Sequence, residues 1–486
     1  MLGSLWSNDT VVAVLETPLL RVTTPPLATW DDLLPDQAKR LPTELATIDA
    51  YLDDERFLAP WQTLFSARLG RPSVPIPTLL RLLYLKHRYQ LGYESLCKEV
   101  GDSISWRRFC RIPLDQPVPH PTTLSKLVRR AGPGVIDQLN TGLLGKLVGD
   151  KLLRGRKLRV DTTVVGANVA YPTDVGLLAR AVAKLVTTSK RVQAAGGAPR
   201  TRVRDRRRAA RRRAHQVARA LRARTGDAKQ LVLEVTGQVA AVAAAQLADA
   251  GRVVANARRA QRGGGAGAGR RAALTEELHT TIQRTRRLLD QARVRLAGGM
   301  PDGATRLVSL HDPDARPIRK GRLGRPVEFG YKAQVVDNPQ GIVVDHTVLV
   351  GNPPDAPLLV PAIGRVIQQT GRVPGAVTAD RGYGEAAVER DLAGLGVARI
   401  AIPRKGRAGP ARQAIQRGRG FRRLVRWRTG CEGRISQLKH RFGWARTLLA
   451  GLQGAQIWCG LGALAHNLVK AAGLLATKQH KAARRR

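Results

Sequence analysis

The sequence predicts a mixed α/β protein, with a helical N-terminal domain and an α/β domain interrupted by a basic helical insertion. Three observations support this. Residues 77–131 are rich in leucine at helical spacing. On both sides of residues 187–300, apolar β-branched runs alternate with segments of helical periodicity. Residues 200–224 are dense in arginine. A chain of 486 residues is long enough for about three domains.

The N-terminal part divides into an arm and a helical domain. Residues 1–60 are acidic relative to the rest and rich in proline and leucine, which predicts an irregular arm with one short helix near residues 41–52. Residues 61–150 predict a helical domain, whose third helix begins near Thr122 and stops at Gly132. A basic segment between its helices carries Arg107 and Arg108 beside aromatic residues. We expect this domain to bind DNA; the alternative is a packing domain with solvated arginines.

The α/β part begins with a predicted strand at residues 157–165 and resumes at residue 327. Two alternating strands there are joined by Asn-Pro-Gln-Gly, which predicts a hairpin. A helix at 356–369, a strand ending at Asp380, a helix at 385–395, a strand at 397–402 and a basic helix follow. This order is that of a ribonuclease-H-like domain, expected over residues 151–186 and 301–454, with a C-terminal helix and basic tail at 455–486.

The insertion is expected at residues 187–300. Residues 200–224 hold twelve arginines and one acidic residue, Asp205. A run of this kind is commonly solvated, and in a protein that acts on nucleic acid it follows the phosphate backbone. The arginines that we expect to contact DNA here are Arg206, Arg207, Arg208, Arg211, Arg212 and Arg213.

Three acidic residues are the candidates for chemistry. Asp161 lies within one buried strand, Asp380 ends another, and Glu432 lies in basic text with helical spacing. Carboxylates on a sheet and an adjacent helix can hold two divalent ions, and oxygen ligands suit Mg²⁺ or Mn²⁺. Such a metal pair activates a water or a 3′-hydroxyl for attack on a phosphodiester.

The charge of the chain indicates a polyanionic partner. Lys and Arg total 82 against 37 Asp and Glu, which gives a net charge of +45. The four cysteines have no zinc-site spacing, so we expect neither disulfides nor structural zinc, and a reducing cytoplasm. We expect no signal peptide at the N-terminus and no membrane span, because His466, Asn467 and Lys470 interrupt the most apolar C-terminal run.

The ordered motifs resemble those of the cut-and-paste DDE transposases of bacterial insertion sequences. Arg428, Glu432 and Lys439 keep the spacing of a Tyr-Arg-Glu-Lys signature, although Val425 stands at the tyrosine position. VDTTVVGANVAYPTD, DPDARPIRKGRLGRPVEFGYK and TADRGYG are also similar to segments of that family. The resemblance covers roughly residues 70–185 and 305–470.

The resemblance implies roles for individual residues. Asp161, Asp380 and Glu432 would bind two Mg²⁺ or Mn²⁺ ions, and Arg428 and Lys439 would hold DNA phosphate. Arg381, beside Asp380, would either steer a phosphate or neutralise the carboxylates.

The resemblance also implies an activity: a bacterial, nucleoid-associated enzyme that binds terminal inverted repeats in double-stranded DNA, cuts them and joins the 3′-hydroxyl to target DNA. Pairing two ends implies a homodimer or a larger assembly. Two alternatives remain open, a non-catalytic DNA-binding descendant and a structure-specific nuclease.

Overall fold

The computed structural model describes residues 19–23, 34–66, 70, 72–223, 228–261, 267–322 and 325–484. The chain forms two compact units. Unit 1 comprises residues 1–166, 332–349 and 353–486, and unit 2 comprises residues 167–331 and 350–352. Each unit is described separately below.

The first part of unit 1 is helical. It contains α2 (Asp36–Lys39), α3 (Thr43–Tyr51), α4 (Ile76–Arg88), α5 (Tyr93–Asp102), α6 (Ile104–Phe109) and α7 (Pro121–Gly149), with short 3₁₀ turns η2 (Glu55–Phe57) and η3 (Ala59–Leu64). The helix expected at residues 41–52 is therefore confirmed as α3. The predicted stop at Gly132 corresponds to a kink, where Gly132 has φ 66° and Pro133 follows. The residues after this kink continue as helix.

A seven-stranded mixed sheet follows. Its order is β2-β3-β1-β5-β6, with β4 paired to β3 and β7 paired to β1. The strands are β1 (Leu158–Ala167), β2 (Arg316–Arg322), β3 (Arg325–Asp337), β4 (Val343–Val350), β5 (Ala376–Ala379), β6 (Arg399–Ala401) and β7 (Arg446–Thr447). The predicted hairpin is confirmed as β3 and β4. The strands expected at residues 157–165 and 397–402 correspond to β1, which extends to Ala167, and to β6, which comprises only Arg399–Ala401.

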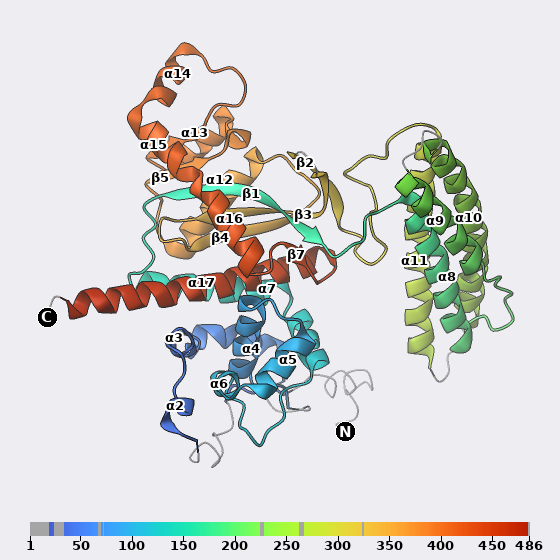
Figure 1. Cartoon of the computed structure of the whole chain (residues 1–486), viewed down its shortest axis with the longest axis horizontal. Coiled ribbons are helices and arrows are strands. Elements are labelled where there is room, and N and C mark those ends of the chain that lie inside the picture. The colour runs from blue at the N-terminus through green and yellow to red at the C-terminus, as the bar shows by residue number, and fades with distance from the viewer. Residues whose placement is uncertain are drawn as a thin grey trace, which may run out of the picture. The chain divides into compact units, whose positions relative to one another are not determined.

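Helices of unit 1 cover this sheet and extend from it (Figure 1). They are α12 (Ala356–Thr370), α13 (Ala386–Gly394), α14 (Pro410–Arg417), α15 (Arg419–Arg428), α16 (Gly430–Arg441) and α17 (Gly451–Ala483), with the 3₁₀ turn η4 (Arg381–Tyr383). The single basic helix expected around Glu432 is divided into α14, α15 and α16. Gly418, which is non-helical with ψ 140°, separates α14 from α15, whereas Thr429 between α15 and α16 keeps helical dihedral angles.

The C-terminal helix α17 forms the central core of unit 1. It runs between the sheet and the N-terminal helices and packs against α7, α4 and α3 (Figure 1). Its middle turns are buried on all sides, from Ile457 to Leu468. His466 and Asn467 are buried too, and Asn467 bonds both the backbone N–H and the carbonyl of Val343 on β4, at 2.9 and 2.8 Å. Buried polar groups with such partners are expected inside a protein core.

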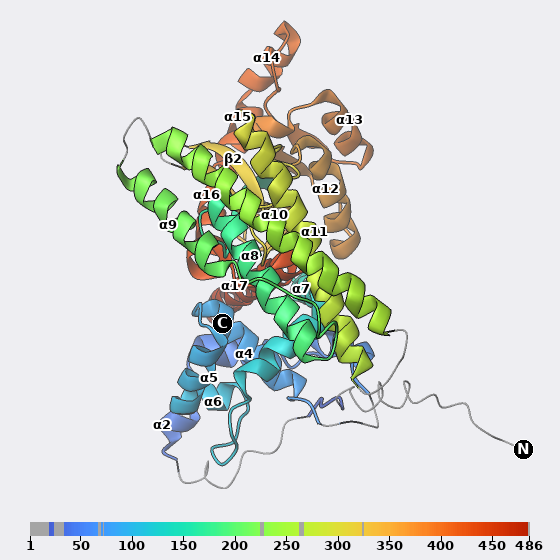
Figure 2. The same ribbon diagram turned by 90° about the vertical axis from the view of Figure 1, so that its right-hand side faces the viewer.

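Unit 2 contains a bundle of four helices, α8 (Asp174–Ala194), α9 (Arg207–Ala223), α10 (Ala228–Gln261) and α11 (Ala268–Leu296), which lie alongside one another (Figure 2). Apolar residues such as Leu178, Val239 and Leu288 form its core. Helix α8 runs across residue 187, where we expected the insertion to begin, and it packs against the other three helices. The bundle therefore includes residues 174–186, which the sequence predicts to belong to the sheet domain.

Two helices, α10 and α17, are long and apolar enough to cross a membrane by length and composition alone. A core helix passes the same test. In α17, 67% of the apolar stretch is buried within the protein, and in α10 the figure is 28%.

Candidate active site

The sheet places Asp161 and Asp380 at neighbouring positions. Strands β1 and β5 are parallel, and their register pairs Val160 with Ala379. Continued by one residue, this register would set Asp161 opposite Asp380, which follows β5 directly. Both strands are rich in valine and threonine and are buried, as expected for parallel strands. Two of the three predicted carboxylates are thus brought together from distant parts of the chain.

Each of these carboxylates is oriented by a nearby backbone N–H group. Asp161 Oδ1 accepts a hydrogen bond from the N–H of Thr162 at 2.8 Å. Asp380 caps η4, and its Oδ1 accepts from the N–H of Gly382 at 2.8 Å. The second oxygen of Asp161 is paired with Arg428, at 3.0 Å from its Nη1.

A third carboxylate, Asp355, lies beside Asp380 and was not predicted. An added Cβ on Gly382 would meet Asp380 Oδ1 at 3.0 Å and Asp355 Oδ2 at 3.1 Å. Asp355 precedes α12, where an acidic residue is common for reasons of helix stability, so its position in the sequence gives no functional signal. It forms an ion pair of 2.6 Å with the buried Lys332, whose Nζ also donates to the carbonyl of Pro353.

The crowding of acidic groups affects ionisation. Burial raises the pKa of Asp380, and the charge of Asp355 raises it further, while the Gly382 N–H, Arg428 and Lys332 act in the opposite direction. Burial also raises the pKa of Tyr383, whose hydroxyl accepts a hydrogen bond from Gln334 Nε2 at 3.1 Å. The negative charges of Asp355, Asp380 and Asp161 raise the pKa of Tyr383 further. This region therefore carries an excess of negative charge that a bound cation would relieve.

Arg428 contacts this acidic region from the end of α15. Its Nη1 lies 3.0 Å from Asp161 Oδ2, and both side chains are mostly buried. Glu432 lies one helical turn further, near the start of α16, and is exposed. Among the described residues, no three His, Cys, Asp or Glu side chains are close enough to hold a metal ion together. The structure thus joins Arg428 to Asp161 without bringing Glu432 to the two aspartates.

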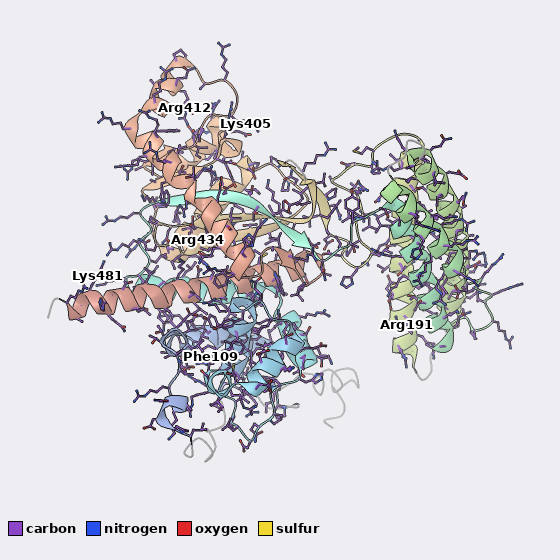
Figure 3. All side chains as sticks on the ribbon, in the orientation of Figure 1. Phe109, Arg191, Lys405, Arg412, Arg434 and Lys481 are labelled. Atoms are coloured by element: carbon purple, nitrogen blue, oxygen red, sulfur yellow. The ribbon has the colours of Figure 1, made fainter. Side chains whose placement is uncertain are left out.

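A buried ion cluster fixes α15 and α16 against the sheet. Asp337, at the end of β3, is fully buried and accepts from Arg159 Nε at 2.7 Å, from Arg159 Nη2 at 2.8 Å and from Arg434 Nε at 3.2 Å. Arg159 also donates to the carbonyl of Trp427 at 2.9 Å. Figure 3 labels Arg434 on α16, in front of the sheet. Because Arg159 is two residues before Asp161, this cluster sets where Arg428 and Glu432 lie relative to β1.

Several predicted DNA-binding side chains have partners within the protein. Arg381 donates to the carbonyls of Arg404 and Gly406, at 3.1 and 2.9 Å, so it holds a loop next to Asp380. Arg107 is buried, and its Nη2 donates to the carbonyls of Pro113, Leu114 and Gln116. The expectation that Arg107 meets DNA is corrected by this burial. Arg108, next to Arg107 on α6, is half-buried. Lys439 on α16 is half-buried too.

The arginine run lies mainly on α9 of unit 2, and its members differ in their surroundings. Arg206 pairs with the buried Asp249, and Arg213 donates to Gln238 at 2.9 Å. Arg207 pairs with Asp205 on the surface. The exposed members Arg208, Arg211 and Arg212 line a cavity of about 1060 Å³ that also contains Arg180 and His215.

All four cysteines are free. Burial raises the pKa of the Cys97 thiol to about 11, and it raises the pKa of Cys110, Cys431 and Cys459 as well. Thiols in such surroundings are poor nucleophiles, so they take no part in the proposed chemistry.

Two segments of the chain match known protein families, and both families are transposase domains. Residues 29–130 match the family described as "Transposase domain (DUF772)", and residues 305–468 match "Transposase DDE domain". The chain is also 28% identical over 137 residues to "Uncharacterized protein ORF8 in nfe locus" of Rhizobium meliloti. That match covers 26% of this chain and 64% of the relative, so the chain spans under two thirds of the relative's length. No solved structure matches the chain. The two family matches contain the N-terminal helices and two of the three predicted acidic residues, Asp380 and Glu432, and the chain belongs to the insertion-sequence transposases with a DDE domain.

Proposed function

We propose that the protein cuts the ends of a mobile DNA element and joins the freed 3′-hydroxyl to target DNA. The observation that carries this proposal is that Asp161, within β1, and Asp380, directly after the parallel strand β5, lie on adjacent strands. Asp380 fits the rule that reactive groups of α/β sheets gather at the carboxyl ends of strands, and Asp161 comes from the strand beside it. The mixed sheet, with β3 and the parallel strand β5 on the two sides of β1, supports a ribonuclease-H-like fold.

Asp161 and Asp380 would hold divalent ions, which we propose to be two Mg²⁺ or Mn²⁺. Their ligand type fits: carboxylate oxygens at a crowded acidic site suit hard cations. A bound pair would supply an activated oxygen nucleophile and stabilise the leaving oxygen. We propose Glu432 as the third ligand, since it lies one turn from Arg428, whose guanidinium already reaches Asp161. Binding of the ions would then require a local shift that separates Arg428 from Asp161.

The protein side chains have distinct tasks in this scheme. Arg428, once released from Asp161, would hold a phosphate of the DNA near the carboxylates, as a charge-assisted contact. Lys439 would do the same further along α16. Lys332 would keep Asp355 neutralised and oriented beside Asp380. The partner would be double-stranded DNA, both inverted repeats and target, and two paired ends require at least a homodimer; the place of action would be the bacterial nucleoid.

The test is a set of charge-neutral variants, Asp161→Asn, Asp380→Asn and Glu432→Gln, assayed on a labelled duplex that ends in the element's repeat. We expect each to lower single-turnover cleavage in Mg²⁺ by more than about 100-fold, since even loss of a residue that supports a metal ligand costs 10- to 100-fold. DNA affinity should change little, because contacts to phosphate supply most of it.

The matched control is Asp290→Asn, an exposed aspartate of unit 2 whose pairing with Arg293 is at the surface. It should cut at the wild-type rate. A site variant that folds, as judged by its melting curve, and still cuts like the control removes that residue from the proposed site. Measuring joined as well as cut product separates a transposase from a nuclease.

A further inference from the structure

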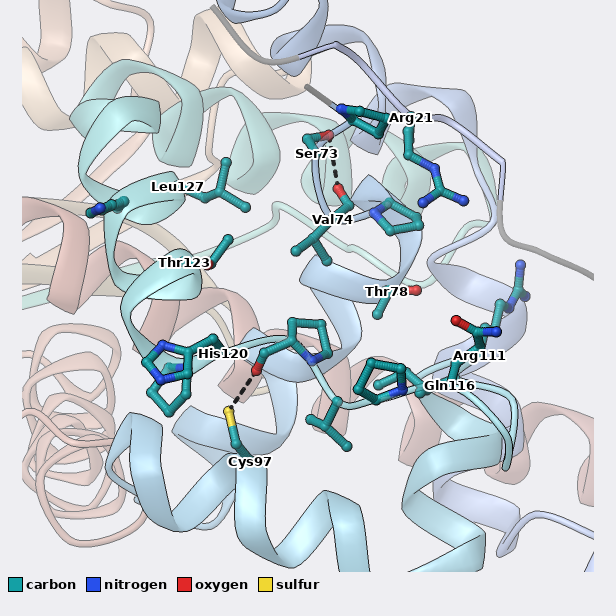
Figure 4. Close-up of a pocket in the computed structure, with 18 of the residues that line it drawn as sticks. Arg21, Ser73, Val74, Thr78, Cys97, Arg111, Gln116, His120, Thr123 and Leu127 are labelled. Carbon is teal, nitrogen blue, oxygen red and sulfur yellow. Dashed lines mark hydrogen bonds between the residues drawn. The ribbon is translucent and has the colours of Figure 1, made fainter. Parts of the chain in front are cut away.

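A second concave site lies among the N-terminal helices of unit 1, which we call the proline groove. It has a volume of about 1210 Å³ and is lined by α5, the first turns of α7, the segment before α4 and the loop between α6 and α7 (Figure 4). None of the proposed catalytic residues lies in it.

The wall of the proline groove is held in place by the protein itself. Arg107 fixes the loop through its bonds to the carbonyls of Pro113, Leu114 and Gln116. Cys97 Sγ donates to the carbonyl of Pro119 at 3.2 Å, which ties the same loop to α5 (Figure 4). Prolines restrict the loop further, since each fixes its own φ angle. The groove is therefore formed before any ligand arrives.

The groove is basic at its rim. Lys98, Lys126 and Arg130 are exposed and form no ion pair within the part of the chain that the structure describes. Lys126 and Arg130 are four residues apart on α7, so they share one helical face. Among the described residues that line the groove there is no aspartate or glutamate. Uncompensated positive charge of this kind fits a polyanion.

The floor of the groove is apolar. It is formed by side chains such as those of Val74, Ile112, Val118 and Leu127, together with the prolines of the loop. A duplex hides the faces of its bases and presents mainly phosphates and base edges. An unpaired strand presents phosphates on one side and apolar base faces on the other, which matches a basic rim over an apolar floor.

We propose that the proline groove binds an unpaired DNA strand next to the element end, with phosphates at Lys98, Lys126 and Arg130 and bases against the floor. The proposal rests on the proposed action on DNA. It assigns to the N-terminal helices the task of holding a strand that is separated from its partner when the end is processed.

The test compares binding of the full chain to two labelled DNAs, a blunt duplex and the same duplex with a short single-stranded tail, by fluorescence anisotropy over a series of salt concentrations. Wild-type protein should bind the tailed DNA more tightly. Lys126→Ala/Arg130→Ala should lose that preference, and the slope of log affinity against log salt on tailed DNA should fall by about 0.7 for each lost phosphate contact. Thr123→Glu places a negative charge at an exposed position of the groove, where it would repel phosphate, and it should lose the preference as well.

The matched control is Arg129→Ala/Lys481→Ala, which removes the same charge. Arg129 is the exposed neighbour of Arg130 on α7 but does not line the groove, and Lys481 lies near the end of α17 (Figure 3). The control should keep the wild-type preference for tailed DNA. Equal binding of both DNAs by wild type, or an unchanged preference in the groove variants, overturns the proposal. Cleavage of the duplex, measured in parallel, shows separately whether the proposed function fails.

Discussion

At the scale of single residues, the structure contains a buried lysine without an acidic partner. Lys86 on α4 is 2% exposed and lies between aromatic rings, with Nζ 4.7 Å from the centre of the Tyr93 ring and 4.3 Å from that of Trp458. No carboxylate pairs with it in the described part of the chain. Burial lowers the pKa of Lys86 to about 8, while the rings stabilise its cation only in part.

This lysine should make stability depend on pH. Between pH 8 and 10.5 the unfolded state binds more protons at this residue than the folded state, so the free energy of unfolding should rise with pH across that window. Below pH 8 the cost of the buried charge is constant, on the order of 3 kcal/mol at most. We expect Lys86→Met, which has a similar shape, to be more stable than wild type at pH 7 and to lose this part of the pH dependence.

The measurement is urea unfolding of both proteins from pH 7 to pH 10. The difference between them should shrink as pH rises, which cancels the contributions of other titrating groups. A constant difference over this range would show that Lys86 keeps an ordinary pKa in the folded protein.

The same scale contains the clearest errors of prediction. Arg107 lies in a basic and aromatic segment that is typical of a DNA contact, yet its guanidinium donates hydrogen bonds to three backbone carbonyls. Asp355 gave no signal, yet it lies against Asp380. In both cases the partner comes from a loop or strand whose position no local pattern encodes.

At the scale of elements, the start of α16 shows how the ion cluster restricts the chain. A Cβ at Gly430 would lie 2.4 Å from Arg159 Nη1, whereas one at Gly433 would have no atom within 4 Å. Alanine is favoured over glycine within helices by about 1 kcal/mol. We therefore expect Gly433→Ala to stabilise the protein by about 0.5 to 1 kcal/mol.

Gly430→Ala should have the opposite effect, although it is the same change in the same helix. The added methyl group would displace the guanidinium that pairs with the buried Asp337, and disturbing such a pair is costly. We expect a lower free energy of unfolding in urea and slower DNA cleavage, because α15 and α16 carry Arg428 and Glu432. Equal stability of the two variants would mean that the cluster can rearrange freely.

At the scale of the whole molecule, the net charge is +45, and some of the cationic side chains behind it bind partners within the protein. Arg206 and Arg213 on the run at 206–213 have partners within the helical bundle, while Arg208, Arg211 and Arg212 are exposed. Neutralising these three as glutamines should lower affinity for specific and random duplexes alike. If all three contact phosphates, the slope of log affinity against log salt should fall by about 0.9 for each.

Two arginines offer the contrast for that experiment. Arg206→Gln and Arg213→Gln should mainly lower the melting temperature, since Arg206 neutralises the buried Asp249. An unchanged salt slope in the triple variant would make the exposed arginines a solvated surface or a protein-binding face.

The sequence by itself determined the segments of β1, β3, β4, β5 and β6, the hairpin of β3 and β4 and the resemblance to DDE transposases, but not β2, β7 or the division of the basic helix. Those properties depend on local periodicity, turn chemistry and short motifs, which are encoded within a few residues of one another. Even the placement of Asp161 within a strand and of Asp380 at the end of one was visible, because both lie in apolar, β-branched runs.

Only the tertiary structure decided which side chains meet. Strand register placed Asp161 beside Asp380, the packing of α15 brought Arg428 to Asp161, and the position of α12 brought in Asp355. It also placed α17 in the core of unit 1 and included α8 in the helical bundle. These outcomes depend on contacts between segments separated by hundreds of residues, where the free energy of packing selects one arrangement out of many that the local patterns permit.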